Sequence, residues 1–394
     1  MQPHLADLET PFKPATLPIP FTRPDIGERE KQAVLAALEA EHIGGNGPIS
    51  RALEARLCEL FGVQHALLTT SCSDALELAM MSARIGPGDE VIMPSMTFVS
   101  TANAVIRERA MPVFADIRPD TFNLDPADVE RLITPATRGI IPVHYAGQGC
   151  DMAALQALAK AHGLWVVEDA AQGVGALYDG RYLGTIGDMG CYSFHVTKNV
   201  SCGEGGAFLT NDDEIARRAE IIREKGTNRS AFLRGEVDKY TWVDVGSSFI
   251  PSDLLSALIL AQLDRLTEIT TRRLVIWHRY DNELGPLAET GKIILPHIDS
   301  RATINGHIFA FRTYAPERRD GLLEMLRQKG IQATFHYVPL HSSPFARRYL
   351  GSARDLPTTD LVSGSLVRLP LFSTLTDEQQ AYIIETLYEI CESW

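Results

Sequence analysis

The chain has 394 residues, of which 22% are charged and 45% hydrophobic, and its formal net charge is −13. This composition is typical of a globular protein, and a chain of this length buries about three quarters of its unfolded surface without disulfides or metals. The acidic balance argues against nucleic-acid and membrane-surface partners, because both require clustered lysine and arginine. The six cysteines include no C-x-x-C pair, which indicates a reducing, cytoplasmic environment.

Residues 1–25 lack the pattern of a secretory signal and are predicted to form an N-terminal arm. A helix over 28–39, a glycine-rich loop over 44–48 and a helix over 50–61 follow. Short apolar runs then alternate with helical segments, as in a parallel sheet covered on both faces. The predicted strands are 65–69, 90–93, 111–116, 139–144 and 164–168, and the predicted helices between them are 73–85, 97–108, 125–132 and 152–162.

The alternation of strands and helices changes after Asp169. Two further strands, 189–195 and 206–210, flank a glycine-rich loop, and a helix over 212–225 precedes a polar stretch over 226–240. A long helix over 254–284 leads into a mixed segment that begins near residue 291, and no apolar run reaches the ~20 residues that span a membrane. We therefore predict an α/β protein with a large, mostly parallel domain over 26–270 and a smaller α+β domain over 271–394.

Ligands of open parallel sheets bind beyond the carboxyl ends of the strands, and four residues are candidates there. Asp169 points into the crevice or caps the next helix. Lys198 is either buried, with its pKa lowered toward neutrality, or extended to solvent. Ser73, in the turn Ser71-Cys72-Ser73-Asp74, either helps to bind a phosphate or caps a helix, and Phe98 either stacks on a planar ligand or packs in the core.

Taken together, the four residue types match one cofactor. A site for pyridoxal phosphate needs a lysine for the covalent link, an acid for the pyridine nitrogen, a phosphate cradle and a stacking aromatic side chain. All four occur at strand ends of one predicted sheet. The combination predicts an enzyme that uses pyridoxal phosphate for amination or decarboxylation.

Several motifs carry a resemblance to a known family. They are Gly45-Asn46-Gly47-Pro48, Ser73-Asp74-Ala75-Leu76, Pro87-Gly88-Asp89-Glu90-Val91-Ile92, Pro94-x-x-Thr97-Phe98, Glu168-Asp169-Ala170-Ala171-Gln172, Ser193-Phe194-His195-x-Thr197-Lys198-Asn199 and Gly203-Glu204-Gly205-Gly206. In these motifs the chain resembles the DegT-like sugar-nucleotide aminotransferases of pyridoxal-phosphate fold type I, from about Ile19 to the C-terminus. Four further stretches, 142–147, 223–230, 238–242 and 336–341, are similar to the members that make dTDP-4-amino-4,6-dideoxygalactose.

The resemblance implies a homodimer with shared active sites. Glutamate would aminate C4 of a dTDP-4-keto-6-deoxyhexose, leaving 2-oxoglutarate and supplying a sugar for surface polysaccharide. Lys198 matches the lysine that bonds to the cofactor and moves the proton at C4, and Asp169 matches the acid at the pyridine nitrogen. The other matches are Ser73, Ser193 and the backbone of Cys72 and Asp74 at the phosphate, Gln172 near the phenolic oxygen, Phe98 on the ring, and His341, Tyr337 and His336 near the sugar.

The chain departs from the family pattern at the phosphate. Many members have an Asn and, two residues later, an Arg that reach the phosphate region from the other subunit, whereas this chain has Ser248 and Ile250. The Ser248 hydroxyl either takes over this contact or belongs to a turn. Asn228 and Arg229 lie in the stretch 223–239, which holds five cations and either binds the nucleotide diphosphate or is a solvated loop. Cys72 stands where the family has Gly.

Three alternatives stay open at this stage. The first is amination of a related keto-sugar, at C3 or linked to UDP. The second is a sugar dehydratase, against which Lys198 argues because those relatives have His at this position. The third is a non-enzymatic regulator, which the net charge and the lack of a DNA-binding motif oppose.

Overall fold

The computed structural model describes residues 17–351, 354–392 and 394. Its centre is a seven-stranded sheet in the order β1-β9-β8-β5-β4-β2-β3. β9 is antiparallel to both of its neighbours, and the other strands are parallel to one another. The strands are β1 (His65–Thr69), β2 (Glu90–Pro94), β3 (Met111–Ala115), β4 (Thr137–Ile140), β5 (Trp165–Asp169), β8 (Met189–Ser193) and β9 (Gly206–Thr210). The predicted α/β class is confirmed.

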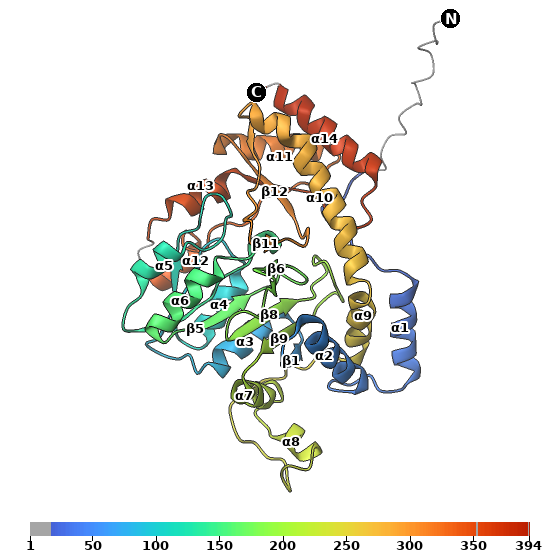
Figure 1. Cartoon of the computed structure of the whole chain (residues 1–394), viewed down its shortest axis with the longest axis vertical. Coiled ribbons are helices and arrows are strands. Elements are labelled where there is room, and N and C mark those ends of the chain that lie inside the picture. Colours follow the sequence, from blue (N-terminus) through green and yellow to red (C-terminus); the bar gives the residue numbers. More distant parts are fainter. Residues whose placement is uncertain (1–16, 352–353, 393) are drawn as a thin grey trace, which may run out of the picture.

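Helices cover both faces of the sheet (Figure 1). One face packs against α3 (Cys72–Ser82), α4 (Val99–Arg107) and α7 (Asp213–Arg223), and the other against α2 (Pro48–Phe61), α5 (Pro126–Leu132), α6 (Met152–His162) and α9 (Asp253–Leu263). Successive residues of a strand point to opposite faces, so Val166 of β5 lies in one core and Val167 in the other. None of the described helices is long and apolar enough to cross a membrane.

The C-terminal part of the chain has a core of its own around three antiparallel strands, β10 (Ile293–Ile294), β12 (Phe309–Thr313) and β13 (Leu366–Leu369). The other elements here are α10 (Leu266–Glu289), α11 (Arg319–Gln328), α12 (Pro344–Leu350), α13 (Pro357–Ser365) and α14 (Asp377–Glu392). Ile19, from the predicted arm, is buried in this core and pairs with Ile331. Residues 1–16 of that arm lie outside the described residues, and the domain boundary at residue 270 stays a prediction.

Two predicted elements differ from those observed. The helix predicted over 254–284 is two helices, α9 and α10, because the chain turns at Asp264 and Arg265, where the Arg265 guanidinium binds Asp25 and Glu30. The strand predicted over 139–144 is β4, which ends at Ile140, since Pro142 has no N–H to extend the ladder. A small three-stranded sheet, β6 (Leu177–Tyr178), β7 (Arg181–Tyr182) and β11 (Ala302–Thr303), had no signal in the sequence.

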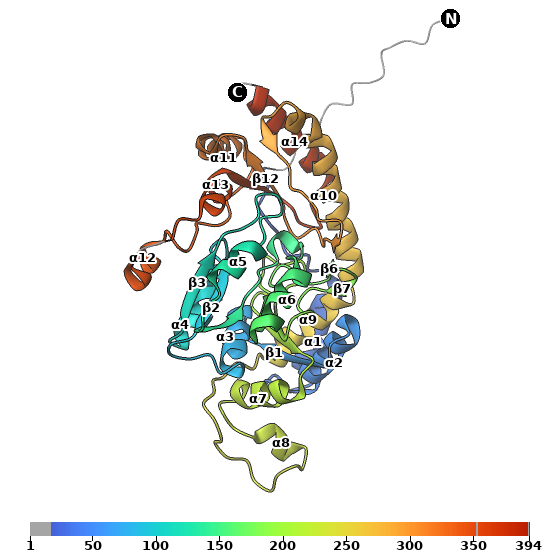
Figure 2. The same cartoon turned by 60° about the vertical axis from the view of Figure 1, so that its left-hand side comes forward.

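The polar stretch over 226–240 contains a short helix, α8 (Arg229–Leu233), which projects with its flanking loops from the body of the molecule (Figures 1 and 2). Large apolar side chains are exposed along this projection, among them Leu233, Tyr240, Trp242 and Val245, and Trp242 is 76% exposed. Large exposed apolar side chains gathered on one projection are typical of an interaction surface.

A carboxylate from far along the chain holds the loop between α1 (Glu28–Glu39) and α2. Asp253, the first residue of α9, is buried and accepts the backbone N–H groups of Gly47 at 3.2 Å, Ile49 at 3.1 Å and Ser50 at 3.1 Å. These are donors that the first turn of a helix leaves without intrahelical partners. Gly47 is required there, because a Cβ at this position would overlap the Asp253 carboxylate.

Candidate active site

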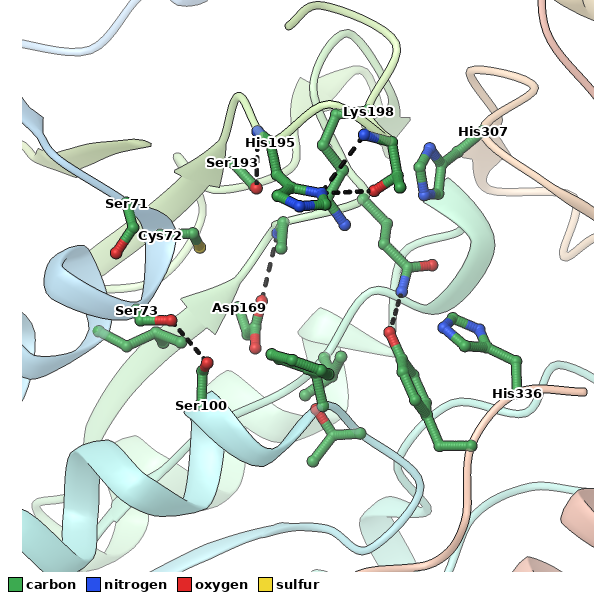
Figure 3. Close-up of a pocket in the computed structure, with 18 of the residues that line it drawn as sticks. Ser71, Cys72, Ser73, Ser100, Asp169, Ser193, His195, Lys198, His307 and His336 are labelled. Atoms are coloured by element: carbon green, nitrogen blue, oxygen red, sulfur yellow. Dashed lines mark hydrogen bonds between the residues drawn. The ribbon is translucent and has the colours of Figure 1, made fainter. Parts of the chain in front are cut away.

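A cavity of about 530 Å³ opens at the carboxyl ends of β5 and β8. Its walls come from four parts of the chain: the turns before α3 and α4, the segments after β5 and β8, the C-terminal unit, and Phe21 of the arm. Nine predicted site residues line it, namely Cys72, Ser73, Phe98, Asp169, Gln172, Ser193, Lys198, His336 and Tyr337. Figure 3 shows how the labelled side chains face the space between them.

Asp169 is the last residue of β5, and its carboxylate is buried at the cavity wall. The Thr101 hydroxyl donates to Oδ2 at 2.7 Å and the Ala171 backbone N–H donates to Oδ1 at 3.2 Å. Burial raises the pKa of Asp169, while these two hydrogen bonds and the positive charge of Lys198 oppose the rise. The remaining acceptor capacity of the carboxylate is free for a cationic N–H in the cavity.

Lys198 lies in the segment that follows β8 and lines the cavity. Its ammonium makes no hydrogen bond or ion pair with any described residue. Burial lowers the pKa of Lys198 from 10.5 to about 8, although the negative charge of Asp169 acts in the opposite direction. The amine is therefore largely uncharged above about pH 8, instead of only above its usual 10.5, and the uncharged form is the one that attacks a carbonyl carbon.

The start of α3 forms one end of the cavity. Ser71 caps the helix by accepting the Asp74 backbone N–H at 3.1 Å, and the Ser73 hydroxyl lies 2.6 Å from that of Ser100. Gly206 lets β9 lie against this turn, because a Cβ there would overlap the backbone of Ser71 and Cys72. Free N–H groups and hydroxyls at a helix N-terminus suit a phosphate group.

On the side of the cavity opposite the start of α3, side chains hold each other in position. Gln172 accepts the Ala146 backbone N–H at 2.7 Å, and its amide donates to the Tyr337 hydroxyl at 3.1 Å. The Tyr337 ring lies 6.3 Å from that of Phe98, centroid to centroid. Phe98 is 57% exposed, so it is not a core residue, and its ring is available to a planar ligand in the cavity.

Five predicted residues do not line the cavity of the described chain: Asp74, Asn228, Arg229, Ser248 and His341. The Asp74 carboxylate accepts the hydroxyls of Thr70 and Ser71. The ring of His341 lies 2.7 Å from the Ser95 hydroxyl and also faces Asp360. The other three belong to the projecting loops around α8 and the strand-like segment that follows them.

Sequence reasoning missed several residues of the cavity, among them Ser71, Ser100, His307 and Arg368, and the supporting Thr101. Two of them had a signal. Thr101, in the first turn of α4, follows the motif residue Thr97 by four positions. Arg368 is a single charge inside an apolar run, Leu366-Val367-Arg368-Leu369. Phe21, which also lines the cavity, had no signal in the sequence. The arm that carries it reaches the cavity through the pairing of Ile19 with Ile331.

A second buried carboxylate, Glu168, lies directly before Asp169 on β5 and faces away from the cavity. It accepts the backbone N–H groups of Gly184 at 2.9 Å, Ile186 at 2.6 Å and Gly187 at 2.7 Å. His144 Nε2 lies 2.8 Å from it, and His144 Nδ1 accepts the Cys150 backbone N–H, which leaves Nε2 as the donor. Glu168 thus ties the 184–187 loop to the back of the site.

Comparison with known proteins identifies the family of this chain. The DegT/DnrJ/EryC1/StrS aminotransferase family matches residues 24–388. The chain belongs to this family. SpsC of Bacillus subtilis (strain 168), a spore coat polysaccharide biosynthesis protein, is 34% identical over 380 residues, which cover 94% of this chain and 97% of SpsC. The predicted enzyme class, an aminotransferase, is confirmed.

Two solved structures show the same fold. DesV of S. venezuelae is 34% identical with a TM-score of 0.87, covering 96% of this chain and 99% of DesV. Spr1654 of Streptococcus pneumoniae, described as a sugar aminotransferase and solved in PLP and PMP forms, is 30% identical with a TM-score of 0.87 in its PLP form, covering 95% of this chain and 99% of the other. These likenesses support pyridoxal-phosphate fold type I and the predicted cofactor.

The residues of the cavity fit pyridoxal phosphate. Lys198 offers an amine with a lowered pKa, and Asp169 offers a buried carboxylate with free acceptor capacity. The first turn of α3, which includes Ser73, offers N–H groups and a hydroxyl for the phosphate. Phe98 and Gln172 would border the ring.

Proposed function

We propose that this aminotransferase moves the amino group of glutamate to C4 of a dTDP-4-keto-6-deoxyhexose, giving dTDP-4-amino-4,6-dideoxygalactose and 2-oxoglutarate. The observation that carries the reaction is the cavity in which Lys198, Asp169 and the start of α3 face one another. The choice of sugar rests on the stretches 142–147, 223–230, 238–242 and 336–341. The description of SpsC supports a role in making surface polysaccharide.

Bound pyridoxal phosphate supplies an electron-withdrawing ring that accepts the electron pair of the substrate C–H bond. Lys198 would hold the cofactor through its uncharged amine; once released, it would take the α-proton of glutamate in the first half-reaction and deliver a proton to C4 of the sugar in the second. Asp169 keeps the pyridine nitrogen protonated, because a buried carboxylate beside it stabilises the positive charge. Thr101 and the Ala171 N–H hold that carboxylate in place.

The remaining residues bind and orient the cofactor and the sugar. Ser73, Ser193 and the backbone of Cys72 and Asp74 bind the phosphate, while Phe98 stacks on the ring and Gln172 lies near the phenolic oxygen. On the other side of the cavity, Tyr337 and His336 contact the sugar.

We further propose that the enzyme works as a homodimer in the cytoplasm, with the domains divided near residue 270. The projection around α8 carries exposed apolar side chains, Trp242 the most exposed among those named above, which support contact with a second copy. Asn228, Arg229 and Ser248 then serve the partner's cavity. His341, held by Ser95, positions the 336–341 loop near the sugar.

The test is a product assay with purified enzyme, pyridoxal phosphate, glutamate and dTDP-4-keto-6-deoxyglucose. We expect one 2-oxoglutarate for each amino sugar, with the proton couplings of H4 reporting the galacto configuration. Lys198→Ala removes the covalent link and the proton carrier, and we expect a loss of about 10⁴-fold. An unchanged rate in this variant would overturn the role of Lys198.

The same assay separates the alternatives. Faster turnover of a UDP-linked or 3-keto sugar would replace the proposed substrate with that one. Loss of a sugar hydroxyl without 2-oxoglutarate would indicate a dehydratase. A monomer in sedimentation with full activity would overturn the shared site.

A further inference from the structure

His307 lies in the cavity wall with the position of its ring proton fixed. It comes just before β12, is 4% exposed and lines the cavity. Its Nδ1 lies 3.0 Å from the side-chain oxygen of Asn199. The Asn199 amide nitrogen donates to the backbone carbonyl of Asn305 at 2.9 Å, so the oxygen of that amide is the atom that faces His307. Because an amide oxygen only accepts, Nδ1 of His307 carries the proton.

This tautomer makes Nε2 of His307 a hydrogen-bond acceptor. Burial holds the pKa of His307 well below its usual range, and the positive charge of Lys198 acts in the same direction, so the imidazole is uncharged. An uncharged imidazole with its proton on Nδ1 has a free lone pair on Nε2. Nε2 makes no hydrogen bond to any described residue. A buried acceptor costs free energy unless a ligand supplies a donor.

The contacts of His307 hold its ring in place. Arg273 of α10 donates to the His307 backbone carbonyl. The Asn305 side chain accepts the His307 backbone N–H at 3.0 Å and donates to the Gln172 backbone carbonyl at 2.9 Å. With the bond from Nδ1 to Asn199, these contacts connect His307 to α10 and to the segments that follow β5 and β8. The acceptor is therefore in position before a ligand enters the cavity.

His307 lies away from the proposed phosphate end of the cavity. It faces Ser71 and Ser73, at the start of α3, from the opposite side (Figure 3). It is close enough to Lys198 for the charge of that residue to act on it. In the proposed function Lys198 delivers a proton to C4 of the sugar. A group bound by His307 therefore belongs to the part of the substrate near its reacting carbon.

The two substrates of the proposed function differ in the donors that they bring to this place. Both carboxylates of glutamate only accept hydrogen bonds, and its amino group is the one that is transferred. A 4-keto-6-deoxyhexose carries hydroxyls, and one of them is on C3, directly beside the carbonyl carbon. A hydroxyl is a donor that fits an uncharged Nε2.

We propose that His307 accepts a hydrogen bond from the hydroxyl beside the keto group of the sugar, and that it thereby selects the keto-sugar for the second half of the reaction. This inference rests on the proposed function in one respect, that the amino acceptor is a nucleotide keto-sugar. His307 is a specificity-determining residue in the wall opposite the start of α3.

The experiment measures the keto-sugar half-reaction by the change in cofactor absorbance, starting from enzyme loaded with pyridoxamine phosphate. The substrates are dTDP-4-keto-6-deoxyglucose and its analogue without the C3 hydroxyl. We expect the wild type to prefer the hydroxylated sugar about 10- to 100-fold in kcat/KM, because the analogue leaves a buried acceptor unpaired. In His307→Phe, which keeps a planar ring but has no acceptor, the preference should fall to about threefold or less. His307→Gln, whose side-chain oxygen accepts, should lie between.

The analogue without the C2 hydroxyl is the matched control. The C2 hydroxyl is not beside the keto group, so its removal should have the same effect in the wild type and in His307→Phe. The half-reaction with glutamate should stay nearly unchanged in the variant, because glutamate brings no hydroxyl. Thermal unfolding and the absorbance of bound cofactor identify a variant that has lost its fold or its cofactor. If His307→Phe is such a variant, His307→Ala takes its place.

Nitrogen NMR of histidine-labelled protein gives a readout that needs no turnover. The signals of His307 are those that are missing from His307→Phe, and they should report a proton on Nδ1 and none on Nε2. Adding dTDP-6-deoxygalactose, which has no keto group to react, should shift the Nε2 signal. Its analogue without the C3 hydroxyl should leave that signal in place.

The outcomes are distinct. An equal preference for the C3 hydroxyl in the wild type and in a folded His307→Phe protein overturns the proposal, and so does a proton on Nε2. A variant that loses discrimination at C2 instead of C3 also overturns it and assigns His307 to the other hydroxyl. If the wild type does not turn over the dTDP-linked sugar, the proposed substrate fails. The role of His307 is then decided by the same analogues of the keto-sugar that the enzyme does turn over.

Discussion

Glu168 and Asp169 are consecutive acids on β5, and their side chains lie on opposite faces of the sheet. Glu168 accepts four hydrogen bonds, from Gly184, Ile186, Gly187 and His144, which fill the four acceptor sites of a carboxylate. Asp169 accepts two and lines the cavity. The number of hydrogen-bond donors that the fold supplies therefore distinguishes two kinds of buried carboxylate. One with all its acceptor sites filled stabilises the fold, and one with free acceptor sites can bind a ligand.

The largest effect on kcat should follow from changing Asp169, the acid that faces the cavity. Asp169→Asn keeps the shape and removes the negative charge beside the cofactor nitrogen, so we expect kcat to fall about 10³-fold. Thermal unfolding should change little, because only two hydrogen bonds involve this side chain. A variant that instead unfolds early while its folded fraction turns over normally would break the comparison.

Glu168→Gln tests the other face. An amide has one acceptor oxygen, so its NH₂ group would face backbone donors, and we expect the free energy of unfolding to fall by about 3 kcal/mol. Denaturant titration measures this loss, and the folded fraction should keep most of its kcat. A large loss of kcat at unchanged stability would assign Glu168 to the chemistry.

The pH dependence of cofactor binding sharpens the comparison. Because burial lowers the pKa of Lys198 to about 8, its amine is uncharged above that pH, well below the usual 10.5. The rate at which the apoenzyme binds pyridoxal phosphate covalently should therefore fall about tenfold per pH unit below 8.

Glu168 and Asp169 should affect the midpoint of this pH dependence differently. Asp169 raises the pKa of Lys198 through its charge, so Asp169→Asn moves the midpoint to lower pH. Glu168→Gln should leave the midpoint in place. A midpoint near 10 in the wild type would contradict the burial of Lys198.

Thr101→Val gives the smallest effect. The variant keeps the shape of the side chain but loses the hydroxyl that donates to Asp169, and we expect kcat to fall roughly tenfold. Thr97→Val removes a neighbouring cavity-wall hydroxyl, which precedes α4 and lies 2.8 Å from that of Thr101, and it is the control for a general loss of polarity at this wall. An equal loss in both variants would show that the wall as a whole, and not the bond to Asp169, sets the rate.

The sequence predicted those parts of the site whose position follows from the strand that they directly follow in the chain. Lys198 and Asp169 follow apolar strands, and strand ends of a parallel sheet share one edge, so their meeting was expected. The role of Glu168 was not predicted, because its donors come from the 184–187 loop, whose path depends on tertiary packing. Arg368 enters the cavity from a strand 170 residues after Lys198, and no local pattern indicates which face of β13 it occupies.

The pairing of β1 has a consequence for synthesis of the chain. β1 bonds in the sheet only to β9, α1 and α2 pack on α9, and Ile19 pairs with Ile331. Each of these partners lies far later in the chain and is translated after the segment that it contacts. The strands β2 to β5, which pair with one another, are complete far earlier. The segment from Ile19 to β1 is therefore among the last to reach its native contacts, and until then it is a candidate for binding by chaperones.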